Sequence, residues 1–344
     1  MHTAQRRFLI LACAAACSSA ADAPALVTRI REHMREYISH LPDYTCRITL
    51  ERFRRLRARA PFDLSDRLRL EVAYTGGQEL YSWPGDARFE TGIEALLPGH
   101  GMVSNGSYAL HVRNLFLRDV AEFSAPLQEK SDDRPCVRLD FQVSALRSGY
   151  SLSAGNSSAP AALTGSAWFD PTSLDILRLE VRVDEAPPSV RIAATRETTT
   201  YQRARIGDAE FVLPGTSEMF LRDRDGSELM NHSSFDQYRR FTGSSTVSYA
   251  PAGDAPAATA PPAPPPAAQP RPGKPMTATL DARIGEDAAI GDSFTATTTD
   301  GVQLSGRITD MRHVGKTWTV ELTLPGMVLR LALPVKAGTK LAQK

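Results

Sequence analysis

A proline- and alanine-rich tract divides this chain into two parts of unequal length. Ten of the 26 residues from Ala250 to Pro275 are proline. Because proline fixes φ and lacks the backbone N–H, the tract cannot join a helix or a sheet. It should run as a stiff polyproline II spacer, about 80 Å long at 3.1 Å per residue. We therefore predict two folded domains, 21–249 and 276–344, which the spacer 250–275 holds apart.

The first twenty residues have the features of an export signal. Arg6 and Arg7 precede a short apolar run from Phe8 to Ala16, and small residues follow before Ala21. This run is too short to span a bilayer, so we expect no transmembrane anchor after cleavage. We predict an exported protein of the periplasm or outer membrane, with an extracellular location and lipidation at Cys17 as alternatives.

Composition and motifs exclude several functional classes. The net charge of +1 provides no field that attracts nucleic acid. The sequence contains no HExxH, P-loop or dinucleotide fingerprint, so we predict no cofactor, no metal site and no enzymatic activity. One segment offers histidine and serine for a hydrolase, but no Gly-x-Ser-x-Gly element accompanies it. We interpret it as a flexible turn; its polar residues are His100, Ser104, Asn105, Ser107 and His111.

The hydrophobic pattern predicts one long helix followed by many strands. Apolar residues recur at helical spacing from Ala25 to Leu41, and Pro42 ends this helix. Apolar and polar residues then alternate, which is typical of antiparallel strands with one exposed face. A segment from 91 to 118 interrupts them with glycines and a second helix. The strands of the first domain are expected at 46–51, 68–74, 78–83, 120–128, 135–143, 163–169, 174–183, 190–204, 210–213, 217–222 and 228–249.

These elements predict a mainly β fold with a minor helical part (α+β). A curved antiparallel sheet needs a cover on its concave face, and the two helices are the available covers. The C-terminal domain is expected to be small and all-β, with strands at 293–298, 302–309, 318–324 and 327–333.

Cys46 and Cys136 are the only cysteines after the leader. Export permits a disulfide between them. Two separate buried thiols are an equally good interpretation, because reduced cysteine packs well in a core. The spacing fits no zinc site.

Parts of the sequence resemble known families. The segment from Gly165 to Val183, with its turn at Asp170-Pro171-Thr172, resembles a hairpin of the LolA/LolB-like outer-membrane lipoprotein carriers, in which an Asp-Pro-x-Thr type turn joins the strands; the order of elements is similar as well. This resemblance implies an unclosed β half-barrel with an apolar cavity for acyl chains. The elements Leu41–Cys46 and Trp83–Gly85 are similar to those of a family of secreted bacterial proteins of uncharacterised function. Around Gly291–Ala296 the C-terminal part resembles small β domains of TrbI-like conjugal-transfer envelope proteins.

The candidate binding residues fall into two groups. The first group lies on the apolar inner side of the curved sheet. These residues line either a ligand cavity, with the interrupting segment as its lid, or an ordinary filled core. Its predicted lining residues are Ile48, Leu50, Leu70, Val72, Phe141, Trp168, Leu179, Leu115 and Phe116. The second is a set of arginines for anionic head groups, which would otherwise form a solvated face; it comprises Arg52, Arg54 and Arg69.

Two functional hypotheses remain open at this stage. In the first, the protein is a non-catalytic binder of a lipid, a lipoprotein or another apolar ligand, and its C-terminal domain holds an envelope protein partner. In the second, it is a structural or interaction module of an envelope assembly with a filled core, and partners bind by strand addition.

Overall fold

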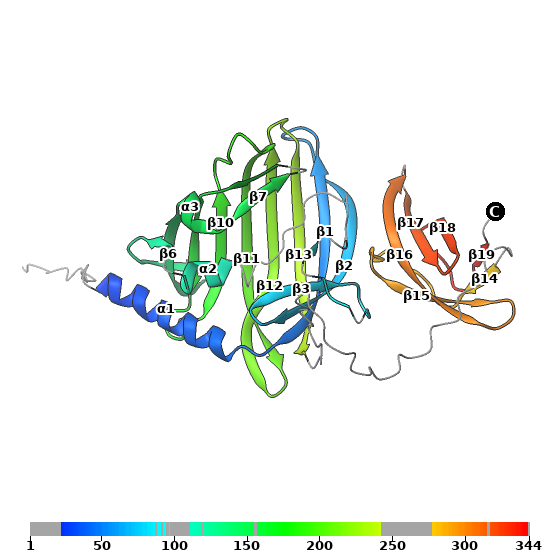
Figure 1. Ribbon diagram of the computed structural model, residues 1–344, viewed down its shortest axis with the longest axis horizontal. Coiled ribbons are helices and arrows are strands. Elements are labelled where there is room, and N and C mark those ends of the chain that lie inside the picture. Colours follow the sequence, from blue (N-terminus) through cyan, green and yellow to red (C-terminus); the bar gives the residue numbers. More distant parts are fainter. Residues whose placement is uncertain are drawn as a thin grey trace, which may run out of the picture.

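The computed structural model describes residues 22–86, 88–90, 92–93, 96, 111–118, 120–131, 133–154, 157–241, 277–314 and 317–342. These residues form an eleven-stranded sheet, a six-stranded sheet and a two-stranded hairpin, all antiparallel (Figure 1). The predicted mainly β fold is therefore confirmed.

The large sheet contains the strands of the first part of the chain. Its strands are β1 (Tyr44–Arg55), β2 (Asp63–Thr75), β3 (Gln78–Ser82), β4 (Glu122–Phe123), β5 (Leu127–Ser131), β6 (Arg134–Val143), β9 (Leu163–Phe169), β10 (Ile176–Val183), β11 (Ile192–Ile206), β12 (Ala209–Asp223) and β13 (Glu228–Arg240). Their spatial order is β3-β2-β1-β13-β12-β11-β10-β9-β6-β4, and β5 also pairs with β6. β1 pairs with β13, so the first and the last strands of this part of the chain are neighbours in the sheet.

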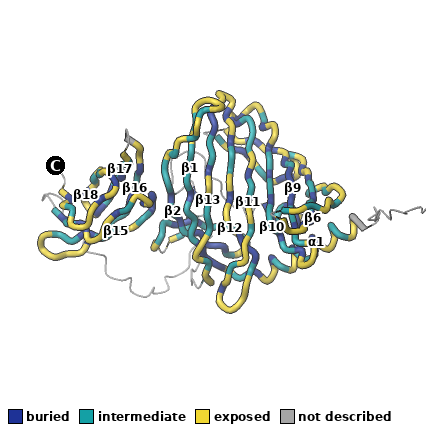
Figure 2. The backbone as a smooth tube through the Cα atoms, turned by 180° about the vertical axis from the view of Figure 1, so that it is seen from behind, coloured by how far each residue is buried: buried dark blue, intermediate teal, exposed yellow. Residues whose placement is uncertain are grey.

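One face of the large sheet is buried because its residues alternate along each strand. On β2, Leu68, Leu70 and Val72 are buried, whereas Arg67 and Arg69 on the other face are half-buried. We call the buried side the inner face and the opposite side the outer face. Figure 2 shows buried and exposed positions alternating along the central strands.

Helix α1 (Asp22–His40) packs against the core of this sheet, as the sequence pattern predicted. Ile30, Met34 and Ile38 are buried at helical spacing. The Tyr37 hydroxyl donates a hydrogen bond to the backbone oxygen of Val212 on β12 (2.8 Å). Figure 1 shows α1 in dark blue, running across the lower part of the sheet in that view.

The structure differs from the sequence prediction in several places within the first part. The single strand expected at 120–128 is two short strands, β4 and β5. The residues expected as two strands, 210–213 and 217–222, form the single strand β12, because a bulge opposite Thr200 and Tyr201 accommodates Pro214 and Gly215. The segment after β6, for which the sequence pattern predicted no element, contains α3 (Ala145–Ser148) and a hairpin of β7 (Ser151–Ala154) and β8 (Ser157–Pro160).

The expected second helix is shorter than its pattern suggests. Among residues 111–118, only α2 (Arg113–Phe116) and the two residues before it are helical. Leu115 and Phe116 of α2 are buried on the inner face. The expected lid residues from 97 to 110 lie outside the described residues.

The small sheet is formed by the C-terminal residues. Its strands are β14 (Thr277–Leu280), β15 (Ser293–Thr298), β16 (Gln303–Val314), β17 (Thr317–Leu324), β18 (Met327–Ala332) and β19 (Lys340–Ala342), in the order β18-β17-β16-β15-β14-β19. The four strands expected from the sequence are present, and β14 and β19 are added. The small sheet lies beside β1 and β2 (Figure 1), and Ile290 forms a parallel bridge with Leu68. The expectation that the spacer holds the two parts away from each other is therefore wrong.

Candidate functional site

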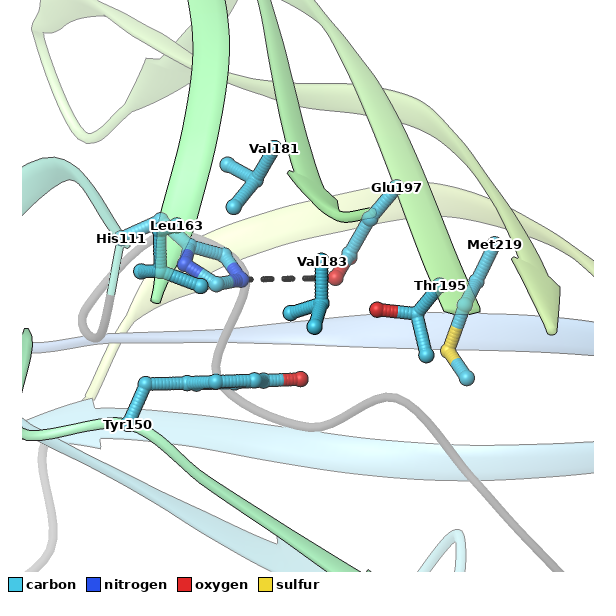
Figure 3. Close-up of a pocket in the computed structure, with 8 residues that line it drawn as sticks. All are labelled: His111, Tyr150, Leu163, Val181, Val183, Thr195, Glu197 and Met219. Carbon is cyan, nitrogen blue, oxygen red and sulfur yellow. Dashed lines mark ion pairs between the residues drawn. The ribbon is translucent and has the colours of Figure 1, made fainter. Parts of the chain in front are cut away.

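A small pocket lies on the inner face of the large sheet. Its volume is about 10 Å³, which is room for about one water molecule. Four neighbouring strands provide its floor, and two residues from covering segments close it (Figure 3). The lining residues are His111, Tyr150, Leu163, Val181, Val183, Thr195, Glu197 and Met219.

The pocket floor follows from strand alternation. Val181 and Val183 are two residues apart on β10, and Thr195 and Glu197 are two residues apart on β11, so each pair points to the same face. The cover has a different origin: His111 lies just before α2, and Tyr150 lies between α3 and β7. A pocket built this way changes shape when the cover moves, because its floor belongs to a continuous sheet.

The polar end of the pocket is an ion pair. His111 Nε2 lies 3.4 Å from Glu197 Oε2, and both residues are more than 90% buried. On its other oxygen, Glu197 accepts a hydrogen bond from Ser217 Oγ (3.1 Å), and Thr199 donates to that same Ser217 hydroxyl (3.2 Å). The carboxylate is thus held in place from two sides, as a buried charge requires.

Tyr150 closes the pocket beside this ion pair. Its ring centroid lies 5.8 Å from that of His111. Burial raises the pKa of Tyr150, and the negative charge of Glu197 raises it further. The hydroxyl therefore stays protonated at neutral pH. Figure 3 shows it directed along the pocket floor toward Val183 and Thr195.

The chemistry of the pocket is that of a small binding site. Half of its lining residues are apolar, and the His111–Glu197 pair provides a polar group at one end; small-molecule sites combine apolar walls with a few placed polar groups in this way. Of the histidine and serine residues proposed above as hydrolase candidates, only His111 is among the described residues, and its recorded partner is a carboxylate. Among the described residues no group of three or more histidine, cysteine or acidic side chains is placed to hold a metal ion.

The cavity residues expected from the sequence mostly pack in the core rather than around this pocket. Seven of them are buried members of a single hydrophobic cluster, and Ile48 is half-buried against it. The seven are Leu50, Leu70, Val72, Phe141, Leu179, Leu115 and Phe116. Their placement fits the filled-core alternative for this part of the inner face.

Trp168 lies on the opposite side of the sheet from the other expected lining residues. Its neighbours Ala167 and Phe169 point into the core, so Trp168 points to the outer face. There its indole N–H donates to Glu129 (3.1 Å), and the Arg178 guanidinium stacks 4.8 Å above the ring. The sequence interpretation of Trp168 as a lining residue is corrected by this strand parity.

The three predicted head-group arginines have different environments. Arg52 is buried on the inner face and forms a two-pronged ion pair with Asp66 (2.6 and 2.7 Å). Arg69 pairs with Asp292 of the small sheet. Arg54 alone of the three is exposed, so the structure does not gather them into one basic surface.

Cys46 and Cys136 are both free and buried in the structure. Cys46 lies on β1 and Cys136 on β6, and the sheet order places six strand steps between these two strands. Neighbouring strands lie about 4.8 Å apart, whereas a disulfide needs Cα atoms within about 7 Å. The structure thus shows two separate thiols, the second of the two interpretations above.

Sequence reasoning missed Tyr150 and Glu197. A signal for Glu197 is present, because it is the one acidic residue among Thr195, Thr199 and Tyr201 on the same face of β11. A carboxylate on a buried face requires a partner. No comparable signal marks Tyr150, since its position depends on how α3 and β7 fold back over the sheet.

Among the described helices, none combines the length and the hydropathy needed to cross a membrane.

Comparison with known proteins gives structural similarities only. No protein-family model matches the chain, and no curated protein matches it. A LolA superfamily protein from Nitrosomonas europaea is similar in structure, with a TM-score of 0.30 and 11% identity, over 62% of this chain and 93% of that chain. A DUF1329 family protein from Desulfovibrio piger is similar with a TM-score of 0.36 and 13% identity, over 65% of this chain and 95% of that chain. The first belongs to the superfamily that the sequence resembles.

Proposed function

We propose that this chain is a non-catalytic binding protein of the cell envelope, and that its inner face binds a lipid, a lipoprotein acyl chain or another apolar ligand. The observation that supports this proposal is the pocket beside His111. Its valine, leucine and methionine walls suit an apolar group, and the His111–Glu197 pair at one end suits a polar head. The export signal predicted from the N-terminal sequence supports a location in the periplasm or at the outer membrane.

Ligand entry requires the cover to move, because the pocket as it stands holds only about one water molecule. One half of the cover, His111, lies just before α2, which is a short helix of four residues with no side-chain cap. Phe116 of α2 packs edge-on against Phe169 of β9 at 5.6 Å, and β9 also supplies Leu163 to the pocket. Displacing α2 would therefore join the pocket to the apolar surface under Phe116.

A second candidate function is an interaction module with a filled core. The observation that favours it is the packing of the predicted lining residues, which bury one another in a single cluster. In that case envelope partners bind at strand edges or loops, and the inner face takes no ligand.

The test is native mass spectrometry of the mature protein from envelope extract, followed by solvent extraction and by titration with a fluorescent fatty acid. A stoichiometric bound ligand, or saturable uptake of the probe, supports the proposal. Val181→Trp should fill the pocket and reduce uptake at least tenfold. Arg182→Trp, which places the same side chain on the outer face of β10, should leave uptake unchanged. A ligand-free mass together with no uptake favours the interaction module.

A further inference from the structure

Part of the β2 strand has an edge that β3 does not cover. β3 pairs only with residues 71–75 of β2. Next to this stretch, Ile290 of the small sheet pairs with Leu68 as a single residue of parallel strand. The Arg69 N–H donates to the Ile290 oxygen and the Ile290 N–H donates to the Arg67 oxygen, both at 2.8 Å. A loop of the C-terminal part thus satisfies backbone groups of an open sheet edge, which otherwise invites pairing with other chains.

Two arginine side chains hold the same loop. Arg69 Nη1 lies 2.5 Å from each carboxylate oxygen of Asp292. Arg67 donates to the backbone oxygens of Glu286 (3.3 Å) and Ala288 (3.5 Å) while it pairs with Glu51. The loop carries three carboxylates in seven residues, Glu286, Asp287 and Asp292. The charges of edge and loop are therefore complementary.

Trp83 restricts the residue that can precede Asp292 at position 291. Gly291 has a φ of +102°, and a Cβ on it would lie 2.4 Å from the Arg69 oxygen and 2.6 Å from Trp83 Cε3. Only glycine avoids both the conformational strain and these contacts. The Arg307 guanidinium of β16 also lies over the Trp83 ring, 5.7 Å from its centroid, and Arg307 pairs with Asp86 at 2.5 Å.

We propose that the edge of β2 from Arg67 to Arg69, together with Trp83, is a strand-addition site for acidic peptide segments, and that residues 286–292 are its resident ligand. We call this site the docking edge. It recognises three features: backbone groups through the parallel bridge, a glycine beneath Trp83, and a carboxylate on Arg69. Its external occupant is an extended acidic segment of another polypeptide, which competes with the resident loop. Because that loop belongs to the same chain, its competition with an external segment is intramolecular.

Amide hydrogen exchange on the full-length protein tests the resident contact. The Arg69 and Ile290 amides bond across the docking edge, whereas the neighbouring Gly291 amide bonds to Ile308 within the small sheet. In Arg69→Gln the charge-assisted bond to Asp292 is lost. We therefore expect amide exchange at residue 69 and at Ile290 to accelerate tenfold or more. Exchange at Gly291 should not change. Asp300→Asn, an exposed carboxylate elsewhere in the small sheet, is the matched control.

Two exchange results would overturn the resident contact. One is unprotected Arg69 and Ile290 amides in the wild-type protein. The other is equal protection in the wild type and in Arg69→Gln.

A labelled synthetic peptide spanning residues 284–294 tests whether the docking edge accepts a ligand in trans. Asp292→Asn weakens the resident loop and leaves the edge intact, so we expect this variant to bind the peptide about tenfold more tightly than the wild type does. Adding Arg69→Gln to that variant should abolish binding. Two results would overturn the strand-addition site. In one, the peptide binds neither the wild type nor Asp292→Asn. In the other, it binds the wild type, Asp292→Asn and the double variant equally.

Discussion

At the scale of single residues, Asp170 organises the turn between β9 and β10. Its carboxylate accepts hydrogen bonds from the Thr172 N–H (2.8 Å) and the Ser173 N–H (2.9 Å). These backbone bonds lower the pKa of Asp170. The turn ends at Leu174, which is buried and has a φ of +61°. One carboxylate thus fixes the register of the hairpin that supplies Val181 to the pocket.

Asp170→Ala should lower the free energy of unfolding by about 1 kcal/mol at pH 7, because two backbone donors lose their acceptor. Asp170→Asn keeps an acceptor oxygen and should cost less. The pKa of Asp170 is lower in the folded state, so its contribution is fully present above the unfolded pKa of about 3.9 and is lost as pH falls through the folded value. Urea unfolding between pH 7 and pH 2 measures this difference; an undiminished gap at pH 2 would contradict the explanation.

Cys46 and Cys136 should remain reduced and unreactive. Burial raises the pKa of Cys46, and the nearby Glu79 charge raises it further; burial and Glu129 do the same for Cys136. Thiolates are therefore scarce at pH 8. We expect iodoacetamide to label the native protein slowly, and to add two labels in denaturant without reductant. Mass spectrometry counts the labels, and a single protein mass with no label in denaturant would show a disulfide instead.

At the scale of elements, α1 closes the core of the large sheet. Ile30 is fully buried between helix and sheet, and Arg29 beside it is exposed. Ile30→Ala should destabilise the protein by about 2–4 kcal/mol, the sum of lost burial and a residual cavity. Arg29→Ala should change stability by no more than about 0.5 kcal/mol. Chemical denaturation compares them; similar values for both would mean that α1 does not pack as described.

The sequence predicts elements well where the period is regular and less well where it is interrupted. Leu68, Leu70 and Val72 alternate with charged residues, and the β2 strand forms as expected. At Pro214 and Gly215 the local signal indicates a turn, but a bulge keeps β12 continuous. Hydrogen bonds to the neighbouring strands keep β12 continuous, and this pairing cannot be read from the sequence of one strand.

The candidate site is harder to predict than the sheet around it. Alternation places Glu197 on the inner face, but its partner His111 comes from a separate segment, so their meeting depends on tertiary packing. Trp168 shows the converse: a large aromatic residue suggests burial, while its neighbours on β9 direct it outward. Residue type is a weaker guide to the inner face than strand parity.

At the scale of the whole molecule, a stiff spacer sets the greatest separation between two domains and not the actual one. The proline-rich composition predicts the greatest end-to-end distance of the tract. It says nothing about complementarity between Arg69 and Asp292, which are 223 residues apart in sequence and in contact in the structure. The alternation on β2 predicts that Arg67 and Arg69 face outward. What covers them follows only from the fold of the C-terminal part.

Docking should couple the stability of the two sheets. A contact made only by the folded small sheet stabilises it through linkage, so Arg69→Gln should lower its melting temperature. A loss of about 1 kcal/mol corresponds to roughly 4–8 °C for a domain of this size. By the same linkage the large sheet should lose about the same free energy, which for its greater size corresponds to roughly 2–4 °C. The charge-swapped double variant, Arg69→Asp with Asp292→Arg, should regain part of the loss, because it restores opposite charges across the contact. Differential scanning calorimetry resolves these transitions, and an Arg69→Gln trace identical to the wild type would show that the contact contributes nothing to stability.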